Sequence, residues 1–283
     1  MSASPSSPSR SVIVTRLRAA GSVFAEDEAR LLISAARTPA VLAAMVDRRV
    51  AGIPLEHVLG WAEFCGLRIS VDLGVFVPRR RTELLVRQAA ALARQAASRA
   101  GQGLARHRSV VVDLCCGSGA VGAALAAALE RVELYAVDID PAAVRCARRN
   151  LAAVGAQVYE GDLYEPLPTT LRGRVDVLVA NAPYVPTEAV GMLPSEARIH
   201  EPRVALDGGA DGLDVLRRVA VGAPLWLAPG AHLLVETSDR QAPQTVEIMA
   251  RCRLIPRVAR SEELNATVVI GTRPARHGDR TAS

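Results

Sequence analysis

Lysine is absent from the chain, and aromatic residues make up only 3% of it. Arginine therefore supplies all the positive charge behind a net charge of +5, which we attribute to coding bias rather than to phosphate recognition. No apolar run reaches the roughly 18 residues that a membrane span needs, and the N-terminus, MSASPSSPSRS, lacks the apolar stretch of a secretion signal. We expect a soluble protein with no membrane partner, and nucleic acid is an unlikely partner on charge alone.

Cysteine is scarce, and its spacing indicates neither disulfides nor a metal site. The number of cysteines is odd, and two of them are adjacent in the sequence, so no disulfide framework is predicted. A reducing cytoplasm is the compartment that fits this pattern. The five are Cys65, Cys115, Cys116, Cys146 and Cys252.

Half of the 283 residues are apolar, so the chain can bury a large core and is long enough for two domains. The apolar spacing from Val12 to Ala51 is helical, with a break at Thr38-Pro39, and Thr82 is a plausible N-cap for the next helix. Residues 101–108 read as a loop. The predicted division is a helical domain over 11–62, a hairpin-like connector over 63–81, a larger domain over 82–273, and disordered tails over 1–10 and 274–283.

From Ser109 onward, apolar strand-like and helical segments alternate. This rhythm predicts an α/β fold with a doubly wound, mostly parallel sheet. The last two segments, RLIPRVA and ATVVIGT, lie close together in the sequence and are expected to pair as an antiparallel edge.

A Gly-rich turn, CCGSGAVG, directly follows the first of these strands. Gly117, Gly119 and Gly122 match the dinucleotide fingerprint, so a nicotinamide-dependent oxidoreductase is one interpretation. Asp113, at the end of that strand, argues against it, because a carboxylate repels a pyrophosphate. The same carboxylate suits the ammonium group of S-adenosylmethionine, which carries no phosphate.

Two more acids follow the next two strands. Asp138 is placed to accept hydrogen bonds from ribose hydroxyls, and Asp162 from an adenine amino group, with Leu163 covering the adenine face. Because the carboxyl ends of parallel strands share one edge of a sheet, the three acids are expected to converge there.

A fourth apolar strand, VDVLVA, ends in Asn181-Ala182-Pro183-Tyr184. This segment resembles the Asn-Pro-Pro-Tyr motif of S-adenosylmethionine-dependent methyltransferases that modify planar nitrogens. The lone pair of such a nitrogen is delocalised, which makes it a poor nucleophile. The Asn oxygen and the carbonyl of the next residue can hold its two hydrogens and direct it at the methyl group, while the aromatic ring stacks on the planar group.

The flanking sequence resembles HemK-type glutamine methyltransferases, which act on peptide-chain release factors. The similar stretches are RRVAGIPLEHVLGWAEFCGLRISVDLGVFVPRRRTELLV, HEPRVALDGGADGLDVLRRV and LVETSDRQ. This resemblance implies a Rossmann-like S-adenosylmethionine-dependent methyltransferase fold over 82–273 and a substrate-recognition role for the helical domain. It implies methylation of a protein glutamine, with a Gly-Gly-Gln motif as the first choice and methylation of a nucleic-acid base as the alternative.

Carried over residue by residue, the resemblance gives two predicted groups. The cofactor group is Asp113, Cys115, Cys116, Gly117, Ser118, Gly119, Asp138, Asp162, Leu163 and Asn181. The acceptor group is Asn181, Ala182, Pro183, Tyr184 and Glu201, the last expected to anchor the catalytic loop through backbone N–H groups.

Three departures from the family pattern stand out. Ala182 replaces a Pro, Cys115 replaces the usual Gly, and Arg80-Arg81 replace Pro-Glu. The two arginines are interpreted either as part of a solvated basic face or as a change in the surface that meets the protein substrate. The cysteines of the Gly-rich turn are expected to pack as small apolar groups, Trp61 and Trp226 are expected to be packing residues, and no chemical role is expected for His200.

Overall fold

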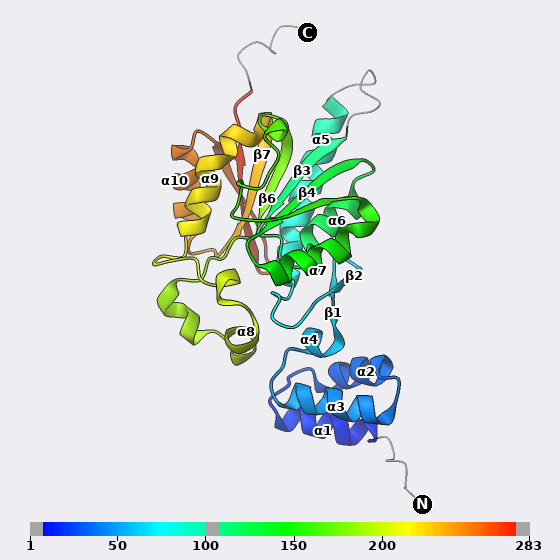
Figure 1. Cartoon of the computed structure of the whole chain (residues 1–283). Helices are drawn as coiled ribbons and strands as arrows, with labels where there is room; N and C mark the ends of the chain where they lie inside the picture. The colour runs from blue at the N-terminus through cyan, green and yellow to red at the C-terminus, as the bar shows by residue number, and fades with distance from the viewer. Residues whose placement is uncertain (1–7, 100–107, 276–283) are drawn as a thin grey trace, which may run out of the picture.

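The computed structural model describes residues 8–99 and 108–275 (Figure 1). The helices are α1 (Arg10–Ala19), α2 (Ala25–Ala35), α3 (Pro39–Val50), α4 (Leu55–Leu59), α5 (Glu83–Arg99), α6 (Ala120–Ala128), α7 (Pro141–Leu151), α8 (Ser195–His200), α9 (Asp214–Trp226) and α10 (Ala242–Arg251). The strands are β1 (Trp61–Phe64), β2 (Leu67–Ser70), β3 (Ser109–Leu114), β4 (Val132–Asp138), β5 (Gln157–Glu160), β6 (Val175–Ala180), β7 (Leu227–Thr237), β8 (Ile255–Ser261) and β9 (Ala266–Thr272). Of the predicted loop and tails, residues 101–107, 1–7 and 276–283 lie outside the described residues.

Helices α1 to α4 form a small bundle around an apolar cluster of their own, apart from the sheet (Figure 1). The break predicted at Thr38-Pro39 is confirmed: the Thr38 hydroxyl accepts the Val41 N–H at 3.2 Å, and Pro39 is the first residue of α3. Arg10, expected in the tail, is already the first residue of α1.

The connector begins with an antiparallel hairpin, β1 with β2, two residues earlier than predicted. Cys65 and Gly66 form its turn, and both have positive φ angles, as a tight two-residue hairpin turn requires. Thr82 directly precedes α5, as predicted, but its buried hydroxyl accepts no N–H from the described residues and so does not cap the helix. The chain enters α5 through a 3-10 turn over Arg80–Thr82. This turn brings the arginines of the connector to the edge of the larger domain.

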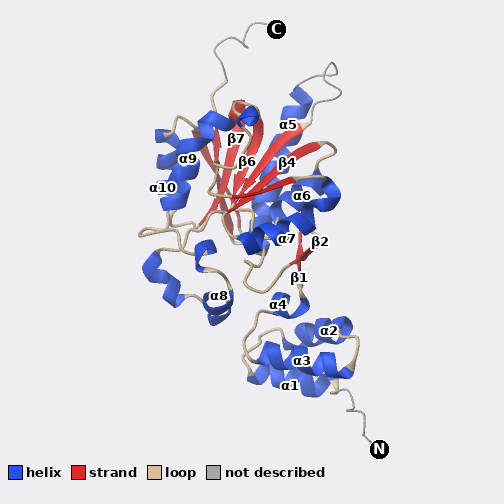
Figure 2. Ribbon diagram, viewed as in Figure 1, coloured by secondary structure: helices blue, strands red, loops and turns tan. Residues whose placement is uncertain are grey.

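The larger domain contains a seven-stranded sheet in the order β5-β4-β3-β6-β7-β9-β8. Figure 2 shows this sheet, in red, with blue helices on both sides. The strands are parallel except β9, which is antiparallel to both of its neighbours and so confirms the predicted antiparallel edge. The chain leaves β3 in one direction, through β4 and β5, and returns to pair β6 with the other side of β3. Ligands of open α/β sheets bind at such a reversal, at the carboxyl ends of the strands.

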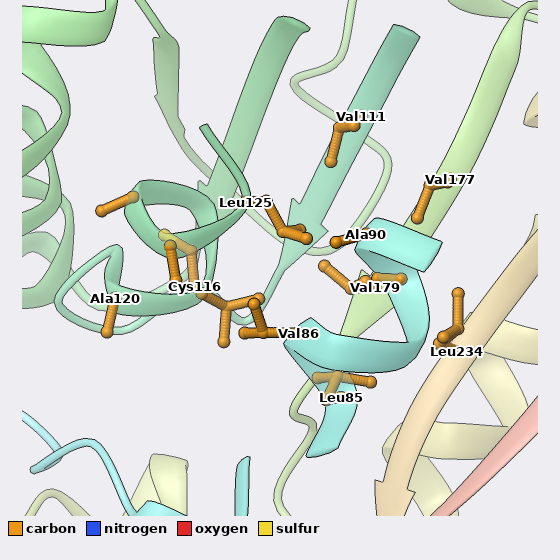
Figure 3. Close-up of a cluster of buried hydrophobic side chains, with 14 of the residues drawn as sticks. Leu85, Val86, Ala90, Val111, Cys116, Ala120, Leu125, Val177, Val179 and Leu234 are labelled. Carbon is orange, nitrogen blue, oxygen red and sulfur yellow. The ribbon is translucent and has the colours of Figure 1, made fainter. Parts of the chain in front are cut away.

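Apolar side chains cover both faces of the sheet, which explains why its central strands are almost continuously apolar. On one face, Val177 and Val179 of β6 contact a cluster formed with α5 and α6 (Figure 3). On the other face, Leu178 and Ala180 pack in a cluster with α9 and α10. The sheet is therefore held from both sides, so the loops at its carboxyl edge start from fixed positions.

The bundle and the larger domain are joined by a charged contact. Arg49 of α3 is only 11% exposed and binds both carboxylate oxygens of Glu28 on α2, at 2.8 and 2.9 Å. The same guanidinium donates to Glu196 of α8 at 2.6 Å. One arginine thus links two helices of the bundle to a helix of the larger domain.

Candidate active site

A cavity of about 590 Å³ opens at the carboxyl edge of the sheet, where β3, β4 and β6 end. Eleven of the predicted site residues line it: Cys115, Cys116, Gly117, Ser118, Asp138, Asp162, Leu163, Asn181, Ala182, Pro183 and Tyr184. Asp113, Gly119 and Glu201 do not. The sheet therefore brings together residues that are up to 69 positions apart (184 − 115).

The Gly-rich turn between β3 and α6 needs backbone conformations that favour glycine. Gly117 and Gly119 have φ angles of +55° and +79°. A Cβ on Gly119 would also lie 3.1 Å from the side chain of Leu151 and 3.2 Å from the Cα of Ala147, so α7 packs directly against the turn. Cys115 has φ +55° as well, a left-handed conformation that explains why the family usually has Gly there.

Asp138, at the end of β4, ties this turn to the neighbouring strand. One carboxylate oxygen accepts the Gly117 N–H at 2.8 Å and the other accepts the Asp140 N–H at 2.9 Å. Burial raises the pKa of this carboxyl, while the two backbone N–H groups favour its charged form. Because a carboxylate has about four acceptor positions, Asp138 retains capacity for hydroxyl donors in the cavity.

Asp113 does not lie where the sequence predicted. It belongs to β3 itself, is 1% exposed, and accepts the Gly122 N–H of α6 at 3.0 Å. Burial raises the pKa of this carboxyl to about 7. Its place under the Gly-rich turn gives it the role of fastening α6 to the strand, away from the wall that meets a ligand.

Asp162 and Leu163 follow β5 and line the cavity beside α9. Arg218 of α9 donates to one oxygen of Asp162 at 2.6 Å, which leaves the other oxygen available to a ligand. Leu163 is buried and has a positive φ of 48°, so the chain turns sharply there and presents a side chain to the cavity.

Asn181 directly follows β6 and is half-buried at the cavity wall. Within residues 8–99 and 108–275, no protein group forms a hydrogen bond with its side-chain amide. Ala182 and Pro183 are buried, and the carbonyl of Tyr184 accepts the side-chain N–H of Gln241 at 3.0 Å. The motif thus has a fixed end and an amide whose hydrogen-bonding groups are free for a ligand.

The Tyr184 side chain is held by Glu236 of β7. The phenol donates to Oε1 of this carboxylate at 3.3 Å. Burial and the nearby Glu236 charge raise the pKa of Tyr184, so the phenol stays protonated as the donor. Arg81 lies on the other side, with its guanidinium carbon 5.9 Å from the centre of the Tyr184 ring.

Glu201 accepts a backbone N–H, as predicted, but from a different segment. Its buried carboxylate accepts the Val77 N–H at 3.2 Å and binds Arg79 at 2.6 Å through both oxygens. Val77 and Arg79 belong to the connector, not to the Asn181 loop. Glu201 therefore fastens the connector against the α8 segment. It does not line the cavity, whereas the following Pro202 does.

The cysteines of the Gly-rich turn, the two tryptophans and His200 show no sign of a chemical role. Burial raises the pKa of both thiols of the Gly-rich turn, and the Asp138 charge adds to this, so the thiols remain protonated. Cys116 belongs to the apolar cluster of α5 and α6 (Figure 3). Trp226 stacks on Tyr164 at 5.7 Å, Arg68 covers Trp61 at 4.1 Å, and His200 lies outside the cavity lining.

Sequence reasoning missed much of the opposite wall. Phe64 and Phe76 line the cavity from the connector. The segments on either side of α8 and part of that helix line it as well, through Leu193, Pro194, Glu196, Ala197, Pro202, Val204, Ala205 and Leu206. Figure 1 shows α8 below the carboxyl edge of the sheet. Asp140 also lines the cavity while its carboxylate caps α7 by accepting the Ala142 N–H at 2.8 Å. The Asp-Pro pair at 140–141 is a sequence signal for an N-cap and could have been used to predict the start of α7. No sequence signal places the two phenylalanines at the cavity, because only tertiary packing brings them there.

Comparisons with known proteins define the family. Residues 95–218 match the family described as "Methyltransferase small domain". A release factor glutamine methyltransferase of Geobacter sulfurreducens is 40% identical over 209 residues, which cover 73% of this chain and 68% of the relative. The chain belongs to the release factor glutamine methyltransferase family.

Two further likenesses show the breadth of this fold. A 4-amino-L-phenylalanine/4-methylamino-L-phenylalanine methyltransferase of Streptomyces pristinaespiralis is 35% identical over 69% of this chain and 65% of the relative. The catalytic domain of hMettl16, solved with the MAT2A 3'UTR hairpin 6, covers 84% of both chains at 14% identity with a TM-score of 0.54. The predicted Rossmann-like methyltransferase fold with its N-terminal helices is confirmed.

The chemistry of the cavity fits S-adenosylmethionine, the cofactor of this methyltransferase fold. The cavity offers carboxylate acceptors near the ends of β4 and β5, Asp138 and Asp162, and apolar side chains such as Val137 and Leu163. Within the described residues, no group of three His, Cys, Asp or Glu side chains could hold a metal ion. None of the described helices is long and apolar enough to span a membrane.

Proposed function

We propose that this member of the release factor glutamine methyltransferase family transfers a methyl group from S-adenosylmethionine to the side-chain amide nitrogen of a protein glutamine. The favoured acceptor is the Gly-Gly-Gln motif of a peptide-chain release factor. One observation carries the proposal. Asn181, whose side-chain amide has no protein partner among the described residues, lines the same cavity as the Gly-rich turn and Tyr184.

The cofactor-binding roles follow from the free acceptors of the cavity. Asp138 accepts the ribose hydroxyls while its backbone contacts keep the Gly-rich turn in place. The oxygen of Asp162 that Arg218 leaves free accepts from the adenine amino group, and Leu163 covers the ring. When bound, S-adenosylmethionine supplies an electrophilic methyl group on a sulfonium centre.

The acceptor roles belong to the motif after β6. The Asn181 oxygen and the Ala182 carbonyl hold the two N–H hydrogens of a planar amide, which directs its nitrogen and favours the positive charge that develops on it. Tyr184, oriented by Glu236, stacks on the flat face of the amide. No strong base is needed, because the methylated nitrogen is acidic and loses a proton readily.

A glutamine suits this cavity better than a nucleobase. A base in a duplex must first be flipped out at a cost of a few kcal/mol, and enzymes that do so have extra surface to grip the duplex. Here residues 186–242 build the cavity wall, α9 and β7. We assign recognition of the protein substrate to the helical residues 11–62 and place the connector, 63–81, between them and the catalytic residues, 82–273. The five free cysteines favour a cytoplasmic location.

The test is transfer of labelled methyl groups to a purified release factor, with peptide mapping by mass spectrometry. We expect one added methyl on the glutamine of its Gly-Gly-Gln motif and none after that glutamine is replaced by alanine. Parallel reactions contain DNA or RNA in place of the protein. Label in nucleic acid but not in protein would refute the glutamine assignment and favour methylation of a base.

A further inference from the structure

Two adjacent arginines of the connector have different surroundings. Arg81 lines the cavity, is 48% exposed in its side chain, and lies beside Tyr184 and Glu236. Arg80 is 77% exposed and points to Glu263 at 3.8 Å, outside the cavity lining. Of these two cations, only Arg81 lies within reach of an acceptor that stacks on Tyr184.

The donors of Arg81 are largely unused. Its Nε lies 3.5 Å from Oε1 of Glu236, which already accepts the Tyr184 phenol, and this separation makes an ion pair but not a good hydrogen bond. Among the described residues, no other acceptor receives the terminal N–H groups of Arg81. The guanidinium therefore offers a planar pair of donors that matches a carboxylate.

The position of Arg81 is fixed by charge. Glu236 is 2% exposed, and its Oε2 has no hydrogen-bond partner among the described residues. The charge of Arg81, and to a smaller extent that of Arg79, offsets this buried carboxylate. Glu236 thus keeps Arg81 next to Tyr184. Arg81 is also one of the positions at which the sequence departs from the pattern that it resembles.

We propose that Arg81 determines which acceptors are methylated, by binding a carboxylate of the acceptor next to its target amide. This inference rests on the proposed glutamine chemistry. The carboxylate belongs either to an acidic side chain adjacent to the glutamine or to the C-terminal carboxylate of a glutamine that ends its chain. In both cases a cation at the same place in the acceptor is repelled.

The experiment uses synthetic peptides with one glutamine in a Gly-Gly-Gln sequence. Three peptides carry Asp, Ser or Lys directly after the glutamine, and two others end at the glutamine with a free or an amidated carboxyl group. Affinities are measured by calorimetry with S-adenosylhomocysteine present, and kcat/KM is measured with labelled S-adenosylmethionine. The proteins are wild type, Arg81→Glu, Arg81→Gln and the matched control Arg80→Glu.

Wild-type protein should bind the Asp peptide about tenfold more tightly than the Lys peptide, the lower end of the effect of one charge-assisted hydrogen bond. Arg81→Glu should reverse the preference, Arg81→Gln should abolish it, and Arg80→Glu should leave it unchanged. A preference only between the free and amidated peptides assigns the carboxylate to a chain end.

The proposal would be overturned if the Asp and Lys peptides bound equally and the free and amidated peptides also bound equally. No binding of any carboxylate peptide, or equal effects of Arg80→Glu and Arg81→Glu, would overturn it as well. The binding measurement separates it from the proposed function. A preference that depends on Arg81 without methyl transfer would leave the carboxylate site in place and refute glutamine methylation.

Discussion

Replacing Asn181 with Ala should separate chemistry from stability. The side chain lines the cavity and has no hydrogen bond to any described residue, so its removal leaves no protein group unpaired. The free energy of unfolding should therefore change by no more than about 0.5 kcal/mol. Loss of one group that stabilises charge in the transition state costs about 10²–10³ in rate, or about 2.7–4 kcal/mol.

The assay is single-turnover methyl transfer to a release factor, with saturating S-adenosylmethionine. Thermal unfolding and calorimetric titration of the cofactor are run on the same preparations. We expect the rate to fall by at least a hundredfold, while the melting temperature and cofactor affinity stay near those of wild type. The reasoning is refuted if the rate is unchanged, or if stability falls in parallel with it, because the amide would then support the fold.

Three further substitutions test the neighbouring residues. Asp138→Ala should weaken S-adenosylmethionine binding at least tenfold in calorimetry, since charge-assisted hydrogen bonds contribute about 1.5–3 kcal/mol each; unchanged affinity in a folded variant contradicts the ribose assignment. Glu201→Ala should cost roughly 2–3 kcal/mol in urea unfolding, because Arg79 and the Val77 N–H lose their acceptor, and a neutral result contradicts the fastening role. Asp113 has a raised pKa, so native protein retains a proton that unfolded protein releases between about pH 4 and 7, and stability falls as pH rises through this range. Asp113→Asn does not titrate at this position, so its free energy of unfolding relative to wild type should rise by up to about 4 kcal/mol from pH 4 to 8. This figure follows from about 1.36 kcal/mol for each pH unit between a pKa of 3.8 and one of about 7. If the difference in stability between the two proteins does not change with pH, the burial argument is contradicted.

The sheet and one side of the cavity were predictable because their signals are local. Strand-length apolar runs alternate with helical ones, and each strand at the reversal is followed by a Gly, Asp or Asn that the sheet geometry brings to one edge. The antiparallel pairing of the last two strands was predictable for the same reason, since their segments are close in the sequence.

The opposite wall depends on contacts that no short stretch encodes. Glu201 binds residues more than 120 positions earlier in the chain, and nothing near it identifies the connector as its partner. Asp113 was predicted to contact the ligand because the sequence does not distinguish an acid at the end of a strand from one inside it. The structure distinguishes them by the Gly122 N–H that meets Asp113 from the first turn of α6.

The helical bundle is not a cassette that can be exchanged freely between relatives. Arg49 neutralises a carboxylate inside the bundle, Glu28, and one on the cavity wall, Glu196. A transplanted bundle that lacks this arginine would leave a nearly buried glutamate without its cation and would release the cavity wall from the bundle. Positions 28, 49 and 196 should therefore change together among close relatives, and a functional chimaera must carry the whole set.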